Sequence, residues 1–181
     1  MLTGKQIIDQ GIVFLDNENH ISHESFLKDG PQQHSVDLNL IKVQRLDDVG
    51  FIPKEGKTVL CKRIEVRSET EWNSESQREV WNLSPGAYDI TFAQGCKIPN
   101  NFRLRIVQRS SLLRNGGLVN SSIFDSGFKT DQIGTIFHIN NPIKIEVGAR
   151  IATAYTEPSN IVEEQDLYSG QYQSDIQRTN I

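Results

Sequence analysis

The sequence predicts an all-β fold, a sandwich or barrel-like roll that carries one short helix at its amino terminus. Short runs of β-favouring residues recur along the chain, and turn signals such as Ser84-Pro85-Gly86 and Asn140-Asn141-Pro142 separate them. Many short strands with regular turns between them are typical of antiparallel sandwiches and barrels. The expected strands are residues 35–43, 58–66, 87–92, 103–107, 135–139, 143–147 and 150–155.

Three segments fall outside these strands. Thr3 is suited to cap a helix over Gly4 to Gln10, and Gly11 would end it. Residues 69–82 are polar and charged apart from two tryptophans, so we interpret them as a surface excursion, with a neighbouring subunit as a candidate partner. The tail after Glu157 is acidic, then rich in Gln, Ser and Asn, and is expected to be mobile in the free protein.

The composition limits the class of protein. A length of 181 residues suits one compact domain. The formal charge of −4 argues against broad nucleic-acid binding. No apolar stretch approaches the ~20 residues that span a bilayer, and no secretory signal is apparent, so we expect a cytoplasmic protein without a membrane partner. The chain has no H-E-x-x-H or C-x-x-C pattern, which excludes zincin-like hydrolysis and zinc-dependent nucleobase deamination.

The run from Gln108 to Gly117 is the strongest chemical signal in the chain. It places Ser110 and Ser111 between Arg109 and Arg114 and ends in a glycine pair. Guanidinium forks, hydroxyl groups and loop N–H groups together suit a polyphosphate. Because Arg-Ser-Ser also occurs by chance in loops, this motif gains its weight from the segments that follow it.

Two later segments complete an ordered set of motifs. Ile123-Phe124-Asp125-Ser126-Gly127-Phe128 joins a carboxylate to a turn and an aromatic ring, and residues 147–154 run from a turn into a strand. Together with the Arg109 run, they resemble the motifs of the dUTPase and dCTP deaminase family. Ser35-Val36-Asp37-Leu38-Asn39-Leu40 and the tail sequence Tyr168-Ser169-Gly170-Gln171 resemble the deaminase branch. The resemblance covers nearly the whole chain.

This resemblance implies a fold and an assembly. The fold would be a distorted jelly-roll or β-barrel of the trimeric dUTPase type, and the assembly a homotrimer whose subunits share their active sites. Residues 1–157 would form a single β domain, and residues 158–181 a mobile tail that closes over the site. The substrate would be a deoxynucleoside triphosphate, with Mg²⁺ bridging its phosphate oxygens.

The resemblance also assigns the phosphate site by position. Arg109, Ser110 and Ser111 would bind the phosphates, Arg114 would lie nearby, and Gln171 would close over the nucleotide from the tail. For Arg114 the alternative is a solvated surface arginine, and for Ser111 it is a helix cap.

Asp125 would act as the general base that deprotonates the water attacking the α-phosphate, with pyrophosphate as the leaving group. The alternative is an aspartate in an Asx-turn before Ser126-Gly127. Phe128 would lie against the deoxyribose and exclude a 2′-hydroxyl, unless it is a plain core residue. Asn120-Ser121-Ser122 resembles the hairpin that binds the pyrimidine edge. Asp37 would sit near the metal, through water.

One missing acid indicates the branch of the family. Zinc-independent deaminases need a glutamate on the strand after the aspartate motif, and here Phe137 or His138 holds that position. The segment Gly148-Ala149-Arg150-Ile151-Ala152 is also closer to the dUTPase form. We therefore predict a dUTP diphosphatase that hydrolyses deoxyuridine triphosphate, although Thr153 stands where dUTPases have glutamine and their glycine-rich tail motif is missing.

Two alternatives stay open. One is a dCTP deaminase or a bifunctional dCTP deaminase/dUTPase. The other is a catalytically inactive deoxynucleotide-binding trimer.

Overall fold

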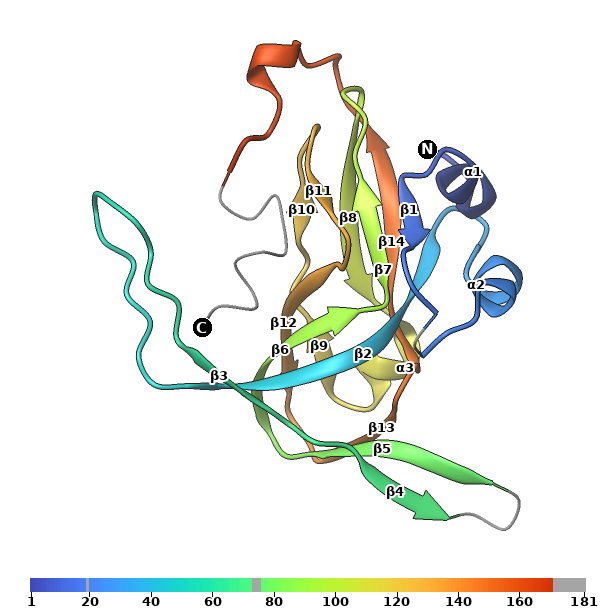
Figure 1. Cartoon of the computed structure of the whole chain (residues 1–181), viewed down its shortest axis with the longest axis vertical. Helices are drawn as coiled ribbons and strands as arrows, with labels where there is room; N and C mark the ends of the chain where they lie inside the picture. The colour runs from blue at the N-terminus through green and yellow to red at the C-terminus, as the bar shows by residue number, and fades with distance from the viewer. Residues whose placement is uncertain (19, 73–75, 171–181) are drawn as a thin grey trace.

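A curled antiparallel sheet of eight strands forms the body of the molecule (Figure 1). The computed structural model describes residues 1–170 except residue 19 and residues 73–75. The strand order is β10-β8-β14-β2-β6-β12-β9, and β3 pairs with β2 beside this path. The strands are β2 (Val36–Asp47), β3 (Lys62–Glu65), β6 (Gly86–Phe92), β8 (Phe102–Gln108), β9 (Gly117–Val119), β10 (Ile123–Phe124), β12 (Gly134–Ile139) and β14 (Arg150–Pro158). This half-barrel confirms the predicted all-β class.

Two three-stranded sheets flank the main sheet. One has the order β1-β7-β11 and the other β13-β5-β4. Their strands are β1 (Val13–Leu15), β7 (Gln94–Lys97), β11 (Lys129–Thr130), β13 (Ile143–Glu146), β5 (Gln77–Leu83) and β4 (Glu69–Trp72). Each of the seven expected strand segments overlaps a strand of the structure.

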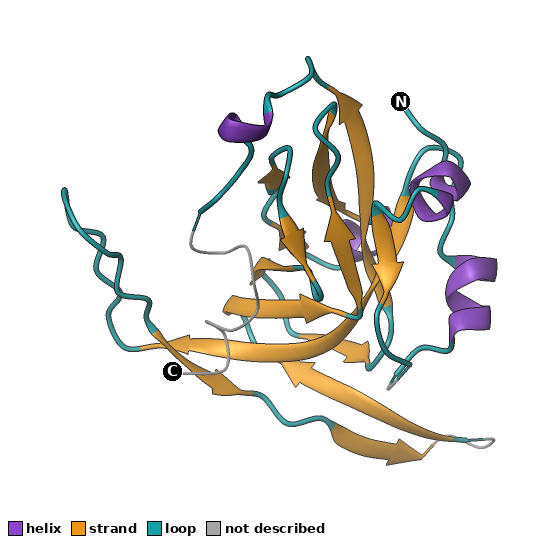
Figure 2. Ribbon diagram, turned by 45° about the horizontal axis from the view of Figure 1, so that its top comes forward, coloured by secondary structure: helices purple, strands orange, loops and turns teal. Residues whose placement is uncertain are grey.

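The helices are short, and the first two along the chain, α1 and α2, lie on the same side of the molecule (Figures 1 and 2). Helix α1 (Gly4–Asp9) begins as predicted, because the Thr3 hydroxyl accepts a hydrogen bond from the Gln6 backbone N–H in a capping box. Gly4 is needed there, since a Cβ would stand 2.2 Å from the Ser35 carbonyl oxygen. Helix α2 (His23–Asp29) was not expected from the sequence, nor were α3 (Ser110–Arg114) and the 3₁₀ turn η1 (Glu164–Asp166).

Residues 69–82 differ from the predicted surface excursion, because most of them form the strands β4 and β5. Trp81 is only 4% exposed and its indole N–H donates to the Val66 carbonyl, 3.0 Å away. Trp72 is 77% exposed near the end of β4. The two tryptophans therefore have opposite environments, one in the core and one in solvent.

A buried amide pair joins β2 to β7. The Gln94 side chain accepts a hydrogen bond from the Asn39 backbone N–H at 2.9 Å and donates to Asn39 Oδ1 at 2.7 Å. The Asn39 Nδ2 group in turn donates to the carbonyl of Gly148. Gln94 is fully buried, so these bonds satisfy polar atoms that water does not reach.

Candidate active site

Arg109, Ser110 and Ser111 form one exposed corner where β8 ends and α3 begins. The Arg109 backbone N–H donates to the Ile151 carbonyl at 2.9 Å, which fixes the corner to β14. Ser110 and Ser111 are exposed in the first turn of α3, and Leu112 buries its side chain beneath them. Three of the five predicted phosphate-binding residues therefore lie together at one place on the surface.

Arg114 lies at the last position of the same helix and is exposed. Its side chain has no hydrogen bond or ion pair to another described residue. The alternative that it is a solvated surface arginine fits this environment as well as a nearby phosphate-binding role does.

A buried carboxylate lies beside this corner. Asp37 on β2 is 2% exposed, and its Oδ2 atom lies 3.3 Å from Nη1 of Arg109 and 3.6 Å from Nη1 of Arg150 on β14. Both guanidinium groups keep about a third of their surface in solvent, 33% and 37%. Arg109, Asp37 and Arg150 thus form a cluster with one carboxylate between two cations.

Opposing effects act on this carboxylate. Burial raises the pKa of Asp37 above its usual value, because desolvation disfavours the charged form. The charges of Arg109 and Arg150 and the hydroxyl of Thr153, the residue opposite Asp37 on β14, act in the other direction. Thr153 occupies the position predicted to differ from the dUTPase glutamine.

Asp125 lies in a tight turn directly after β10. The Phe128 backbone N–H donates to the Asp125 carbonyl at 3.1 Å, and Gly127 takes a φ of 87° that suits glycine. Ser126 is buried and its hydroxyl donates to the Phe102 carbonyl. The Asp125 side chain is exposed and has no hydrogen-bond or ion-pair partner among the described residues, so its carboxylate is free to meet a water molecule or a ligand.

The side chain of Phe128, predicted to lie against the deoxyribose, is almost completely buried. It is 7% exposed and belongs to the hydrophobic core. Its ring centroid lies 5.0 Å from that of Phe124 and 5.3 Å from that of Tyr168. This environment matches the core alternative.

The residues predicted to bind the base connect β9 to β10. Asn120 and Ser121 are exposed, whereas the Ser122 hydroxyl lies 2.9 Å from that of Thr135 on β12. The Asn120 backbone N–H donates to the Ile136 carbonyl. These bonds hold the segment against β12 while two of its three side chains remain available to a ligand.

The two halves of the predicted site lie at opposite ends of β8. Phe124 pairs with Leu104, so Asp125 comes next to Arg103, and Arg109 stands six residues further along. At the rise of an extended strand this is a separation of about 20 Å. One copy of the chain does not bring Asp125 to the Arg109 corner. Gln171 lies outside the described residues.

The position of the deaminase glutamate carries no acid. Phe137 is fully buried, with its ring 6.5 Å from that of Tyr88. His138 is exposed and pairs with Ala87 and Leu118 on the neighbouring strands. A buried phenylalanine cannot transfer protons to a cytosine ring.

The described residues form no ready-made metal centre. No group of three or more His, Cys, Asp or Glu side chains lies together in the described part of the chain. Asp37 is enclosed between two guanidinium groups, and Asp125 stands alone on the surface. These residues fit Mg²⁺ only if phosphate oxygens supply most of its ligands, which is how this ion is commonly held.

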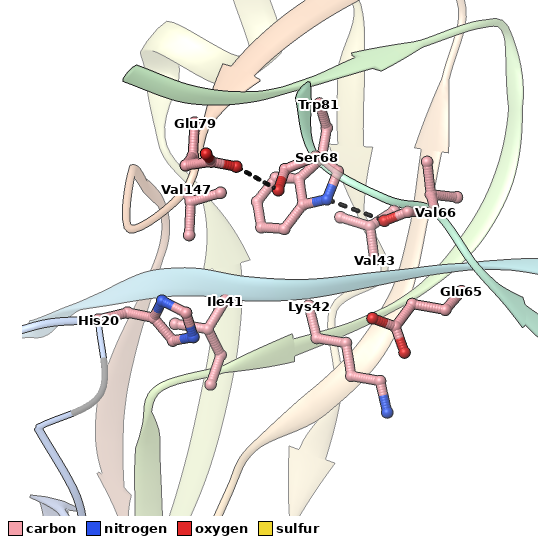
Figure 3. Close-up of a pocket in the computed structure, with 10 residues that line it drawn as sticks. All are labelled: His20, Ile41, Lys42, Val43, Glu65, Val66, Ser68, Glu79, Trp81 and Val147. Carbon is pink, nitrogen blue, oxygen red and sulfur yellow. Dashed lines mark hydrogen bonds between the residues drawn. The ribbon is translucent and has the colours of Figure 1, made fainter. Parts of the chain in front are cut away.

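Two hollows lie close to the main sheet. One, of about 230 Å³, is lined by residues that include Arg150, Asn39 and Asp29 and therefore adjoins the arginine cluster. The other, of about 340 Å³, lies between β2 and β5 and is lined by residues that include Trp81 and Glu79 (Figure 3). None of the predicted nucleotide-binding residues lines the second hollow.

Sequence reasoning gave no role to Arg150 or Tyr168. Arg150 lies in the segment 148–152, and its pairing with Asp37 is a contact across 113 positions that only the folded chain creates. Tyr168 packs on Phe128, and its backbone N–H donates to the Ser126 carbonyl. The Tyr168-Ser169-Gly170-Gln171 sequence was the signal that could have marked it.

The protein is thus a curled β-roll, and the corner of Arg109, Ser110 and Ser111 places a cluster of arginine and serine side chains at one end of its main sheet. Residues 2–154 match the family described as dCTP deaminase-like. The chain belongs to this family.

The curated relatives of this chain carry the name of one enzyme. A deoxyuridine 5'-triphosphate nucleotidohydrolase of Methanocaldococcus jannaschii is 33% identical over 67% of this chain and 74% of its own length. A probable enzyme of the same name from Halobacterium salinarum is 28% identical over 83% of this chain and 87% of its own length.

The crystal structure of 2'-deoxycytidine 5'-triphosphate deaminase from Agrobacterium tumefaciens has the same fold. It superposes with a TM-score of 0.56 at 14% identity over 86% of this chain. The present chain spans about half of that longer one, 48%. Among the described residues, no helix is long and apolar enough to cross a membrane.

Proposed function

We propose that this protein is a dUTP diphosphatase that hydrolyses dUTP to dUMP and pyrophosphate in the cytoplasm. The observation that carries the proposal is the pair of positions that separates the two branches of the family. An exposed carboxylate, Asp125, occupies the diphosphatase position, whereas the deaminase position holds Phe137 or His138, neither of which is an acid. The names of the curated relatives support the same substrate.

The reaction is a displacement at the α-phosphorus atom. Asp125 accepts a proton from a water molecule as the water oxygen bonds to the α-phosphorus. The bond from that phosphorus to the oxygen bridging the α- and β-phosphates breaks, and pyrophosphate leaves with the electron pair. Asp125 suits this role because its carboxylate is exposed and uncommitted within the described structure.

The Arg109 corner binds the phosphates. The guanidinium of Arg109 and the hydroxyls of Ser110 and Ser111 donate hydrogen bonds to phosphate oxygens, and these bonds strengthen as negative charge develops on the leaving group. Arg114, at the end of the same helix, adds positive charge nearby. A bound Mg²⁺ would be held mainly by the phosphate oxygens, with Asp37 contributing through water, and it would neutralise part of the phosphate charge.

The separation along β8 supports an active site shared between copies of the chain. Asp125 and Arg109 are about 20 Å apart along the strand, too far to act on adjacent atoms of one triphosphate. A homotrimer solves this problem if the Asp125 turn of one subunit meets the Arg109 corner of the next.

The base and sugar lie on the side of Asp125. The backbone groups of Asn120-Ser121-Ser122 bind the pyrimidine edge, and Phe128 limits the space at the 2′ position. The tail, residues 158–181, was expected to be mobile, but Tyr168 attaches its first part to the domain. In this proposal the part that follows Tyr168 closes over the nucleotide, with Gln171 reaching the phosphates. The domain is then residues 1–157.

Product analysis tests the proposal. The purified protein is incubated with Mg²⁺ and either dUTP or dCTP, and the products are resolved by anion-exchange chromatography. Formation of dUMP and pyrophosphate from dUTP alone is the expected result. Ammonia and a uracil nucleotide from dCTP would establish a deaminase or bifunctional enzyme, and no turnover of either nucleotide would leave a binding protein.

A further inference from the structure

We propose that Asp37 is a positioning residue that holds the guanidinium groups of Arg109 and Arg150 together as a preformed clamp for phosphate. This inference rests on the proposed function, because the clamp would serve the phosphate chain of the nucleotide. It gives Asp37 a task that is separate from any contact with a metal ion, and it adds Arg150 to the phosphate site.

The first support is the geometry of the cluster. Three neighbouring strands of the main sheet contribute to it: Arg109 follows the end of β8, Arg150 begins β14 and Asp37 lies on β2. A single oxygen, Oδ2 of Asp37, lies 3.3 Å and 3.6 Å from the two guanidinium groups. Two like charges this close together repel, and the carboxylate between them offsets that repulsion.

The Asp37 carboxylate also leaves N–H donors of both guanidinium groups free to bind a ligand. Oδ2 of Asp37 is buried, yet neither guanidinium is aligned to donate a hydrogen bond to it. Nη1 of Arg109 donates instead to the Arg150 carbonyl at 3.5 Å, and Nη1 of Arg150 donates to the Asp29 carbonyl at 2.7 Å. Asp37 therefore attracts both side chains by charge, while most of their N–H groups remain available to phosphate oxygens.

The third support is the distribution of exposure. Asp37 is buried, whereas each arginine keeps about a third of its side chain in solvent. A ligand that approaches this corner meets guanidinium groups before it meets the carboxylate. The cluster retains one net positive charge, which suits a phosphate and disfavours a cation bound directly to Asp37.

The chain contains a matched ion pair that has no place in this clamp. Asp89 on β6 is 6% exposed, and its Oδ2 atom pairs with Nε of Arg63. Removal of the charge at Asp89 also breaks a buried ion pair in the main sheet, but none of the predicted nucleotide-binding residues contacts that pair. Asp89→Asn is therefore the control for a purely structural loss.

The experiment compares Asp37→Asn and Asp89→Asn by calorimetric titration of the full-length protein with α,β-imido dUTP and, separately, with inorganic tripolyphosphate. Asp89→Asn should melt at a lower temperature than the wild type, because it breaks a buried ion pair. Only Asp37→Asn should bind both probes at least tenfold more weakly, because misplaced guanidinium groups lose their fit to the phosphates. Without Mg²⁺, the affinity of Asp37→Asn for tripolyphosphate should be reduced by the same factor, because the clamp acts without a metal ion.

If Asp37 acted only through its charge, the change in binding affinity of Asp37→Asn would have the opposite sign. Loss of one negative charge beside the site would then tighten the binding of an anion, so unchanged or tighter binding by Asp37→Asn overturns the proposal. A loss of affinity that appears only in the presence of Mg²⁺ would overturn it as well, in favour of a metal-linked role. If Asp37→Asn does not fold, Asp37→Glu keeps the charge and displaces the carboxylate, and wild-type affinity in that variant would equally reject the clamp.

The two probes separate this inference from the proposed substrate. A wild-type protein that binds tripolyphosphate but not the dUTP analogue rejects dUTP while the clamp is still measured with tripolyphosphate. A wild-type protein that binds neither probe rejects both proposals.

Discussion

The ring of Tyr168 packs against the ring of Phe128, with the two centroids 5.3 Å apart at an interplanar angle of 63°. In addition, the Tyr168 backbone N–H donates to the Ser126 carbonyl at 3.0 Å. Gly127 completes this junction, because a Cβ there would stand 2.8 Å from the Cβ of Leu167. The segment that follows the last strand is therefore attached to the turn that presents Asp125, within a single copy of the chain.

Replacement of Tyr168 by alanine should loosen this turn. We expect kcat for dUTP hydrolysis to fall several-fold, and the melting temperature to fall because an aromatic pair of about 1 kcal/mol is lost. Steady-state kinetics and thermal unfolding measure the two effects. Tyr168→Phe keeps the ring and serves as the control, so an equal loss of kcat in both variants would assign the effect to the hydroxyl group instead.

Asp125→Asn should separate binding from chemistry. The amide is nearly isosteric but cannot accept the proton of the attacking water, so hydrolysis should fall by about 10²-fold or more. Oligomeric state and affinity for α,β-imido dUTP should remain at wild-type levels, as measured by light scattering and calorimetry. Retained turnover would remove Asp125 from the role of general base.

Complementation between two inactive variants should reveal whether sites are shared. Arg109→Ala loses the phosphate side and Asp125→Asn the water side, so each variant alone should be inactive. Mixed oligomers formed by co-expression contain sites with both intact residues, in roughly a quarter of cases for random assembly of a cyclic oligomer with two-subunit sites. Activity near that level supports the shared site, and no recovery in verified mixed oligomers argues for sites within one subunit.

The stability of the fold should depend on pH through Asp37. Its pKa in the folded protein is raised above 3.8, mainly by burial, so the folded state binds this proton more tightly than the unfolded chain does. The stabilising contribution is then fully present below pH 3.8 and is lost as the pH rises through the raised pKa. Relative to Asp37→Asn, the unfolding free energy of the wild type should therefore decrease over that interval. Denaturant titrations at a series of pH values test this, and an opposite slope would mean that the arginines outweigh burial.

Gln94→Ala should destabilise the fold without touching the nucleotide site. It removes the partners of the Asn39 backbone N–H and of Asn39 Oδ1, and each buried polar group left unpaired costs about 1–3 kcal/mol. Gln33→Ala is the control, because Gln33 is exposed and such surface changes usually stay within about 0.5 kcal/mol. Chemical denaturation of both variants gives the comparison, and equal stability would show that the amide pair contributes nothing net.

Much of the fold was accessible to sequence reasoning, for reasons visible in particular elements. Thr3 and Gln6 form the capping box of α1 within four residues, so the local sequence suffices to start that helix. Strands such as β8 and β12 alternate between core and surface, and this period of two survives in the sequence. Strands of two or three residues, such as β10 and β11, are too short to show any period, and pairing with their neighbours creates them.

The sequence by itself determined the all-β class, the helix at Gly4–Asp9 and the local motifs, because these depend on propensity, periodicity and capping between near neighbours. The Arg109-Ser110-Ser111 corner belongs with them, since its residues are consecutive. Only the tertiary structure decided that Asp37 is buried between Arg109 and Arg150, that Tyr168 lies on Phe128, and that Asp125 stands at the far end of β8. The physical reason is that burial and charge pairing are properties of contacts between distant segments, and these contacts exist only once the sheet has closed around its core.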